Sequence, residues 1–371
     1  MKISSSKNRF IDLSLDKGMR VDGWLFAIIL ALLSFSVIVV FSASGQNTDL
    51  VRVHVIKGLV ALGMFCVMSR INPSYIKQIS VKLYVLSVFL LLLVDFFGEI
   101  RMGAQRWLNL GFMSFQPSEL AKLTVPLVCA YALSHMGLVS KVRHVCVYLG
   151  LIAIPCVLIL GQPDLGTSIM VAFSGLVIVF FAGVPWVFIL AAAGALLLCA
   201  PVIWCYVLRE YQRERILTVL NPEADPLGSG YHVIQSKAAI GAGGQSGVGW
   251  LEGTQTHLGF IPEQHTDFIF AVIGEELGFT GYLILIGLYM LLIGRMFYIM
   301  MRSESSYAKA YIGAIACVVF AYVFVNLGMV TGILPVVGVP LPLVSFGGTA
   351  TMTLLVSLGI VSSYSIRDTK T

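Results

Sequence analysis

The chain has 371 residues, of which 58% are hydrophobic and only 12% are charged. Soluble domains contain about 45–50% apolar and about 25% charged residues, so this composition excludes a soluble globular enzyme and a disordered chain. The net charge of +5 is modest, and we expect no nucleic-acid partner. The seven cysteines lie in or beside apolar runs without a Cys-x-x-Cys pair, which is typical of small core residues rather than of a disulfide framework or a zinc site. The sequence predicts an integral membrane protein.

Ten segments are long and apolar enough for membrane-spanning helices, which need about 20 mostly apolar residues. The first resembles a signal peptide, but its apolar run exceeds the usual h-region of about 7–15 residues, so we expect an uncleaved span. We therefore predict an all-α polytopic membrane protein. Its spans are expected over 23–43, 53–69, 78–95, 117–135, 144–160, 166–183, 186–207, 268–299, 309–331 and 344–364.

Lys and Arg residues are concentrated in the short loops on the side of the membrane that holds the N-terminus, which predicts that both termini are cytoplasmic. We expect a cytoplasmic tail over 1–22, a single ten-helix domain over 23–366 and a short cytoplasmic tail over 367–371. One extracytoplasmic loop, at about 208–267, is far longer than an ordinary connection. Long structured loops often carry function, so the outer face is where we expect chemistry.

Polar residues open the fourth span. Glu119 and Lys122 are three residues apart, so they share a helix face and can pair, with Gln116 one turn earlier. Two interpretations stay open. The pair neutralises itself near the membrane, or Lys122 faces an outer cavity that takes an anionic ligand such as a phosphate, with Glu119 holding it.

Three further outer residues are candidates for substrate binding. Trp107 is typical of the aromatic belt at a membrane interface, yet beside Arg106 it also offers a phosphate clamp and a stacking platform. Asp164 lies near the start of the sixth span, where the helix dipole favours a capping carboxylate.

The long loop contains two recognisable patterns. Residues 211–215 indicate a short amphipathic helix on the surface. The glycine-rich run 241–249 resembles a phosphate loop, but Ser246 stands where the pattern needs glycine and no Gly-Lys-Ser/Thr follows. We therefore assign no phosphate loop, although flexible backbone near a ligand remains open.

The strongest candidate lies at 262–270, where the long loop meets the eighth span. Thr266 or Asp267 is expected to cap that helix, and the dipole would keep Asp267 ionised. An ionised carboxylate at the mouth of a cavity can act as a general base. His265 is more typical of a solvated loop residue.

Small residues follow the acid on one helix face, at Ala271, Gly274 and Gly278, and leave room for a ligand or a close helix neighbour. One of the two glutamates at 275–276 is expected to face the interior. The Pro- and Gly-rich stretch 332–348 predicts an outer re-entrant turn, which is tolerated only when it is buried in protein or lines a cavity.

Several motifs together resemble one family, the SEDS family of bacterial cell-wall proteins. The resemblance covers nearly the whole chain after its first 20 residues, and the short tails are more similar to the branch that acts in cell elongation than to the division branch. The motifs that carry it lie, in order, at 42–46, 103–107, 116–122, 162–168, 225–232, 265–272, 275–278 and 332–348.

The resemblance implies a ten-span peptidoglycan glycosyltransferase that polymerises lipid II at the outer face of the cytoplasmic (inner) membrane during elongation and rod-shape maintenance. It implies a class B penicillin-binding protein and other elongation-complex proteins as partners, and a divalent cation, Mg or Mn, whose ligands we do not assign. The family's essential acid corresponds to Asp267, a second important position to Trp107, and polar cavity residues to Lys122 and Glu119.

The chemistry agrees with these positions. Glycosyl transfer from a lipid diphosphate needs a base at the acceptor hydroxyl and positive charge at the departing diphosphate, from Lys122, Arg106 or a metal. A lipid II flippase is the main alternative, because ten spans and cavity charges suit it equally. A scaffold that only recruits a transpeptidase would leave Asp267 without a task.

Overall fold

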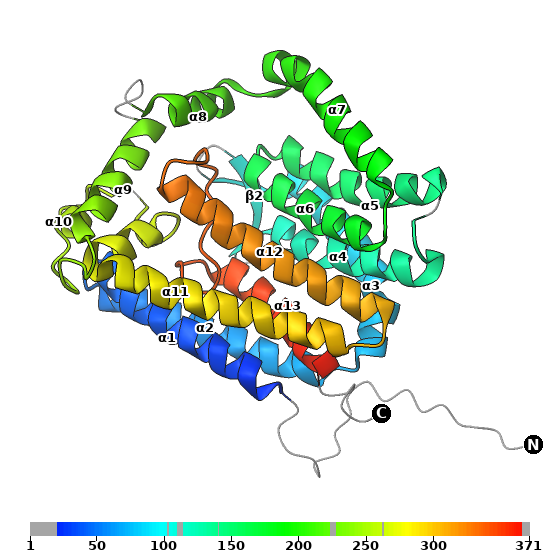
Figure 1. Cartoon of the computed structure of the whole chain (residues 1–371), viewed down its shortest axis with the longest axis horizontal. Helices are drawn as coiled ribbons and strands as arrows, with labels where there is room; N and C mark the ends of the chain where they lie inside the picture. Colours follow the sequence, from blue (N-terminus) through cyan, green and yellow to red (C-terminus); the bar gives the residue numbers. More distant parts are fainter. Residues whose placement is uncertain are drawn as a thin grey trace, which may run out of the picture.

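The computed structural model describes residues 21–101, 104–109, 114–139, 141–222, 228–261 and 263–365. Both predicted tails lie almost wholly outside these ranges. Helices dominate the chain (Figure 1). They are α1 (Gly23–Ala43), α2 (Thr48–Arg70), α3 (Pro73–Phe97), α4 (Pro117–Met136), α5 (Val142–Gly161), α6 (Leu165–Phe181), α7 (Trp186–Val202), the π-helical turn η1 (Ile203–Val207), α8 (Glu210–Leu220), α9 (Ser229–Gly243), α10 (Thr254–His257), α11 (Ile269–Arg302), α12 (Ser306–Val330) and α13 (Gly348–Ser365).

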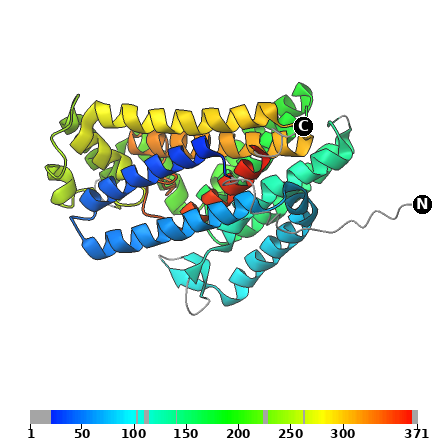
Figure 2. The ribbon, with the colours of Figure 1, turned by 90° about the horizontal axis from the view of Figure 1, so that it is seen from below.

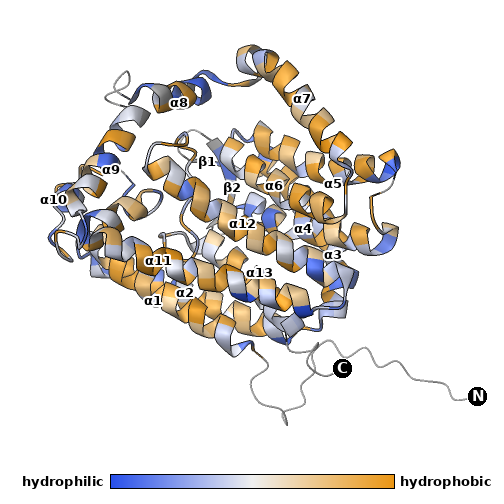
Figure 3. Ribbon diagram, in the orientation of Figure 1, coloured by the Kyte–Doolittle hydropathy of each residue, from blue (hydrophilic) through white to orange (hydrophobic). Residues whose placement is uncertain are grey.

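The predicted multi-pass membrane protein is confirmed. Within the described residues, seven helices have the length and composition of membrane spans, namely α1, α2, α3, α5, α7 with η1, α11 and α12. Helices α4, α6 and α13 coincide with the other three predicted spans. Figure 3 shows apolar residues covering most helices and polar ones gathered on α8 and at helix ends. The total of ten spans and the sidedness stay predictions.

The bundle is built around α11, α12, α13 and α4. Figures 1 and 2 show α11 and α12 side by side, and α1 packs against α11 from below. Helix α13 packs along α2 and also touches α4, α11 and α12. In contrast, α7 buries none of its residues, and Figure 1 shows α7 and α8 standing away from the bundle, whereas α9 packs against α11. The apolar side chains of α7 are therefore exposed or half-buried.

A buried ion pair ties three helices together at the end of the bundle near the two termini. Arg295 on α11 donates from Nε and Nη2 to the two carboxylate oxygens of Asp22, at 3.0 and 2.6 Å. Asp22 also accepts from Ser365 at the end of α13, at 2.6 Å, and from the backbone N–H of Leu25 in α1, at 2.8 Å. A bidentate guanidinium–carboxylate pair of this kind fixes geometry as well as charge.

The outer segment 96–116 contains a small antiparallel sheet that the sequence did not predict. Its strands are β1 (Glu99–Arg101), β2 (Ala104–Asn109) and β3 (Ser114–Phe115), in the order β1-β2-β3. Such short strands carry too few alternating residues for a period-2 signal. The sheet joins α3 to α4 and holds β2 against both helices.

Helix α11 is not one continuous span, because its backbone breaks at Gly278 (φ 61°, ψ −152°). The glycine-rich run 241–249 satisfies the groups that the break frees. The N–H groups of 279–280 donate to the carbonyls of 244–245 at 3.1 and 3.2 Å, and the carbonyls of 275–276 accept from the N–H groups of 248–249 at 3.0 and 3.2 Å. Backbone groups inside a membrane must be paired within the protein, and this run pairs them.

Glycine is required in this run because two backbones meet there. A Cβ built at Gly243 would lie 1.8 Å from the carbonyl oxygen of Gly274 on α11, and one built at Gly247 would lie 2.0 Å from that of Glu276. The space beside the small residues on this face of α11 is thus filled by the backbone of a close neighbour. The run therefore supports α11 at its break through hydrogen bonds and close packing.

We predict that Gly243→Ala destabilises the protein, because its methyl group would meet backbone that cannot move aside. Gly241→Ala, on the same helix, is the matched control, since a Cβ there has no atom within 4 Å. Alanine at a helix position without a clash gains about 0.5–1 kcal/mol over glycine. Thermal unfolding in detergent should show a lower midpoint for Gly243→Ala and an unchanged or higher one for Gly241→Ala. Equal unfolding midpoints for the two variants would contradict the supporting role of this run.

Candidate active site

Asp267 lies in the turn 263–268 that leads into α11, but it does not cap the helix. The N-cap position falls on Phe268, without a side-chain hydrogen bond, because the helix begins only at Ile269. The hydroxyl of Thr266 instead donates back to Glu263, to its carbonyl oxygen at 3.1 Å and its carboxylate at 2.8 Å. The capping prediction for Thr266 and Asp267 is therefore wrong, and the carboxylate of Asp267 is left for another use.

The carboxylate of Asp267 faces a tight glycine turn. A Cβ built at Gly338 (φ +69°) would lie 3.3 Å from Oδ2 of Asp267. Burial raises the pKa of Asp267 to about 6, Glu263 adds to the rise and Arg215 on α8 partly offsets it. The expectation that the helix dipole keeps this group ionised rests on a cap position that Asp267 does not occupy, and burial raises its pKa instead. A carboxyl group with a pKa near neutrality is a better general base.

Glu119 and Lys122 form the predicted pair on α4. The ammonium of Lys122 donates to Oε1 of Glu119 at 2.6 Å, and both side chains are largely buried. Lys122 also lies over the ring of Tyr322 on α12, 5.4 Å from its centroid. All three line a cavity with mostly apolar walls, which runs between α4, α12 and α13 as far as Ser357.

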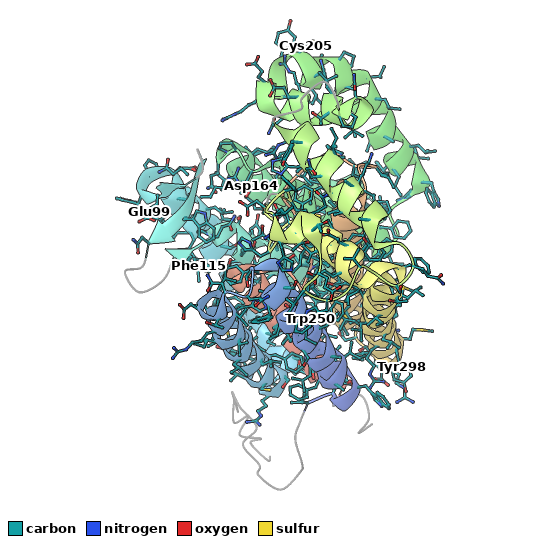
Figure 4. All side chains as sticks on the ribbon, turned by 90° about the vertical axis from the view of Figure 1, so that its left-hand side faces the viewer. Glu99, Phe115, Asp164, Cys205, Trp250 and Tyr298 are labelled. Carbon is teal, nitrogen blue, oxygen red and sulfur yellow. The ribbon has the colours of Figure 1, made fainter. Side chains whose placement is uncertain are left out.

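Arg106, Gln116 and Asp164 come together at the start of α6. In Figure 4, Asp164 is labelled near the small sheet that carries Glu99 and Phe115. The guanidinium of Arg106 donates to the carbonyl oxygen of Gln162 at 3.1 Å and to that of Pro163, and it lies 3.7 Å from Oδ2 of Asp164. Gln116 donates to the same carboxylate at 3.4 Å.

Asp164 also caps α6, as predicted, by accepting the N–H of Thr167 at 3.2 Å. One carboxylate therefore serves as a cap and as the partner of a cation.

Trp107 follows Arg106 on β2 and is half-buried, with Glu99 of β1 opposite it in the sheet. Because successive residues of a strand point to opposite faces of a sheet, the side chains of Arg106 and Trp107 leave β2 on opposite faces.

Residues 331–347 link Asp267, the start of α6 and the cavity that Lys122 lines. They are non-helical, and Val339 and Leu341 are buried, as the predicted re-entrant turn requires. A Cβ at Gly166 of α6 would lie 2.8 Å from the carbonyl oxygen of Val337, and the next residue of the turn, Gly338, faces Asp267. Residues 340–345 continue into the wall of the Lys122 cavity. Asp267 itself does not line that cavity.

The glutamates at 275–276 are both buried and have structural partners. Glu275 accepts from the backbone N–H groups of Gln255 and Thr256 at 2.7 and 2.9 Å, so it holds α10. Glu276 accepts from Ser42 of α1 and lies 3.5 Å from the ring of His257. His265 is half-buried, with its ring 5.9 Å from that of Phe346.

Three residues near the site were given no role of their own in the sequence analysis, namely Tyr322, Asn326 and Ser345. Tyr322 and Ser345 line the cavity, and Asn326 donates to the carbonyl oxygen of Asp267. A polar residue inside an apolar span was the available signal for Asn326. Ser345 falls in the predicted re-entrant stretch, but no sequence pattern indicates its hydrogen bond to the carbonyl of Thr266, 79 residues earlier.

The family resemblance implies a divalent cation, whose ligands stay unassigned. In the part of the chain that the structure describes, no group of three or more His, Cys, Asp or Glu residues could hold a metal ion. The protein side chains thus offer no complete ligand set there.

Comparisons with known proteins point in one direction. The model of the FtsW/RodA/SpoVE family, described as cell cycle protein, matches residues 23–370. The peptidoglycan glycosyltransferase MrdB of Escherichia coli K12 is 47% identical over 347 residues, which cover 93% of each chain.

Two solved structures extend the comparison. A chain from a peptidoglycan synthase complex, in work on the coordination of polymerization and crosslinking, matches with a TM-score of 0.83 at 33% identity, covering 95% of this chain and 99% of that one. The crystal structure of the rod shape determining protein RodA of Thermus thermophilus matches with a TM-score of 0.69 at 29% identity, covering 93% and 96%. The predicted resemblance to the elongation branch, RodA, is confirmed.

We predict that Lys122→Met alone destabilises the fold, because it leaves the buried carboxylate of Glu119 unpaired, at a cost of about 3–5 kcal/mol. The double variant Glu119→Gln with Lys122→Met should recover most of that loss, since it buries no charge. Thermal unfolding of the two variants and the native protein measures both effects. A double variant as unstable as the single one would show that the pair does not neutralise itself.

Proposed function

This chain belongs to the FtsW/RodA/SpoVE family of cell cycle proteins, and from that premise we propose that it is a peptidoglycan glycosyltransferase that polymerises lipid II. The 47% identity to a relative of that name across 93% of the chain is the observation that carries the proposal. Asp267 supports the proposal chemically, because an acid at the start of a membrane-spanning helix can act as a base close to a lipid-linked substrate. The reaction would take place at the outer face of the cytoplasmic membrane, during elongation and rod-shape maintenance.

Asp267 is the proposed general base. The acceptor sugar hydroxyl attacks the anomeric carbon of the donor, its proton passes to a carboxylate oxygen of Asp267, and the bond to the lipid diphosphate breaks. A positioned base contributes about 10²–10⁴-fold to such a step. The pKa of about 6 keeps the group mostly ionised at neutral pH and still basic enough to take the proton.

Lys122 is the proposed cation for the diphosphate. An ammonium has three donors, and Glu119 and Tyr322 each engage one of them, so one donor is left for a ligand in the same cavity. Glu119 holds Lys122 in place. The apolar walls of the cavity, which extend along α13 to Ser357, suit a polyprenyl chain next to that charge.

The cluster beside the sheet would bind the rest of the substrate. Arg106 and Gln116 present N–H donors next to Asp164, and Trp107 offers an aromatic face for a sugar ring. Two N–H groups of Arg106 donate to the carbonyl oxygens of residues 162–163, so this side chain positions that turn as well as offering charge.

The proposal keeps the divalent cation, Mg or Mn, as a requirement of the family resemblance, without assigning its ligands. Mg²⁺ is commonly held by one or two carboxylates together with substrate phosphates. We route no step through it, because the described side chains offer no complete site.

A class B penicillin-binding protein is the proposed partner, along with other elongation-complex proteins. A structural relative comes from a peptidoglycan synthase complex in which polymerization and crosslinking are coordinated. The uncovered helix α7 leaves room for lipid to approach the bundle.

We predict that Asp267→Asn lowers lipid II polymerisation at least 100-fold. The measurement uses purified protein in detergent, with and without the partner, and follows glycan strands on a gel. Asp49→Asn is the matched control, because Asp49 is an exposed acid at the start of α2, away from the site. Normal strand formation by Asp267→Asn would remove the assigned base.

The same assay separates the enzyme from a lipid II flippase. Detergent abolishes membrane sidedness, so a flippase makes no product there, whereas a polymerase forms strands. Wild-type protein that produces none, with a verified partner and substrate, would favour the flippase.

We predict that polymerisation falls as the pH drops through about 6, because Asp267 must be ionised to accept a proton and burial raises its pKa to that value. The folded state holds the proton more tightly than the unfolded chain, so this group makes the protein more stable, not less, as the pH falls through 6. Rates between pH 5 and 8, recorded with unfolding midpoints, test both signs. A rate loss that follows unfolding would contradict the titration.

A further inference from the structure

Three consecutive peptide carbonyls, those of residues 265–267, each accept a hydrogen bond from the segment 326–346. The N–H of Phe346 donates to His265 at 2.8 Å, and the hydroxyl of Ser345 donates to Thr266 at 2.5 Å. The side-chain amide of Asn326 donates to Asp267 at 2.8 Å. Because the chain is not yet helical here, these carbonyls need partners from elsewhere, and every partner lies about 60 or more residues later.

Asn326 does more than satisfy one carbonyl. Its Nδ2 also donates to the carbonyl of Val339 at 2.7 Å. Val339 follows Gly338, whose Cα faces the carboxylate of Asp267. One amide group therefore ties the backbone of the acid to the turn that its carboxylate faces.

The amide is fully buried in α12, an otherwise apolar helix, and a polar group in such a place is costly unless it is paired. Its Oδ1 has no hydrogen-bond partner among the described residues. An unpaired buried acceptor costs free energy, so the side chain is not optimised for stability alone. What it does provide is a fixed geometry between residues 267 and 339.

We propose that Asn326 is a positioning residue for Asp267, holding the backbone of the acid at a fixed distance from the Gly338 turn so that its carboxylate keeps facing that turn. This inference rests on the proposed function. Ser345 makes a second tie of the same kind, because its hydroxyl donates to Thr266 and accepts the N–H of Leu341 at 2.8 Å.

The inference makes a prediction about turnover and its pH dependence. In Asn326→Leu, both ties are lost while the branched shape and the number of side-chain heavy atoms are kept. We expect turnover to fall by about 10–100-fold with little change in KM, because a misplacement of about 1 Å can cost about 100-fold. A released carboxylate gains water, so the acid limb of the pH–rate profile should move to lower pH. The charged groups that act on Asp267 are Glu263 on its own turn and Arg215 on α8, and neither is altered.

The experiment measures lipid II polymerisation by purified full-length variants between pH 5 and 8, normalised to folded protein by size-exclusion chromatography. Ser80→Ala is the matched control, because its hydroxyl is fully buried and bonds Tyr307 on another helix at 2.9 Å, far along the chain from the site. Asn326→Ser, which keeps one donor, serves if Asn326→Leu does not fold, and should show a smaller change in the same direction.

Each outcome decides the matter. A lower turnover together with a shifted acid limb, absent from Ser80→Ala, supports the positioning role. Unchanged turnover, or a loss of activity with an unmoved acid limb, overturns it and leaves Asn326 a structural residue. If the native protein forms strands and Asp267→Asn does not, the proposed function stands even where the positioning role fails.

Discussion

The structure depends on one constraint, which is that backbone inside a membrane bundle must find its hydrogen bonds within the protein. Where the chain is helical, the helix meets this need itself. Where it is not, a distant segment must supply the partners. The break in α11 at Gly278 is matched by the run 241–249, and the turn before α11 is matched by Asn326 and the segment after it. Both pairings lie on the segment that carries Asp267.

The charges inside the bundle follow a similar rule. Lys122 is paired with Glu119, Arg106 with Asp164, and Arg295 with Asp22. Such pairing lets ions remain in a low-dielectric setting, where an unpaired one would shift its pKa or destabilise the fold. Asp267 differs, because burial dominates its surroundings and raises its pKa toward neutrality. The bundle thus holds three paired cations and one acid whose pKa is raised toward neutrality.

Features set by local chemistry were predictable from the sequence. The helices coincide with the predicted spans because a lipid-facing helix needs a long apolar run, and the pair Glu119–Lys122 follows from helical spacing. The cap at Asp164 is equally local. The strands at 99–115 were missed because they are too short for a periodic pattern. The burial of Asp267 could not be read, since Gly338 and Asn326 approach it only in the folded chain.

The failed capping prediction explains how the acid is made useful. A carboxylate at the N-cap would accept backbone N–H groups and feel the helix dipole, and both effects lower its pKa and weaken it as a base. By starting α11 at Ile269, the chain withholds those donors from Asp267. Its position must then be fixed by other means, and hydrogen bonds to its carbonyl fix it without touching the carboxylate. Because these hydrogen bonds reach the backbone and not the carboxylate, the acid can be held in place while its pKa stays raised.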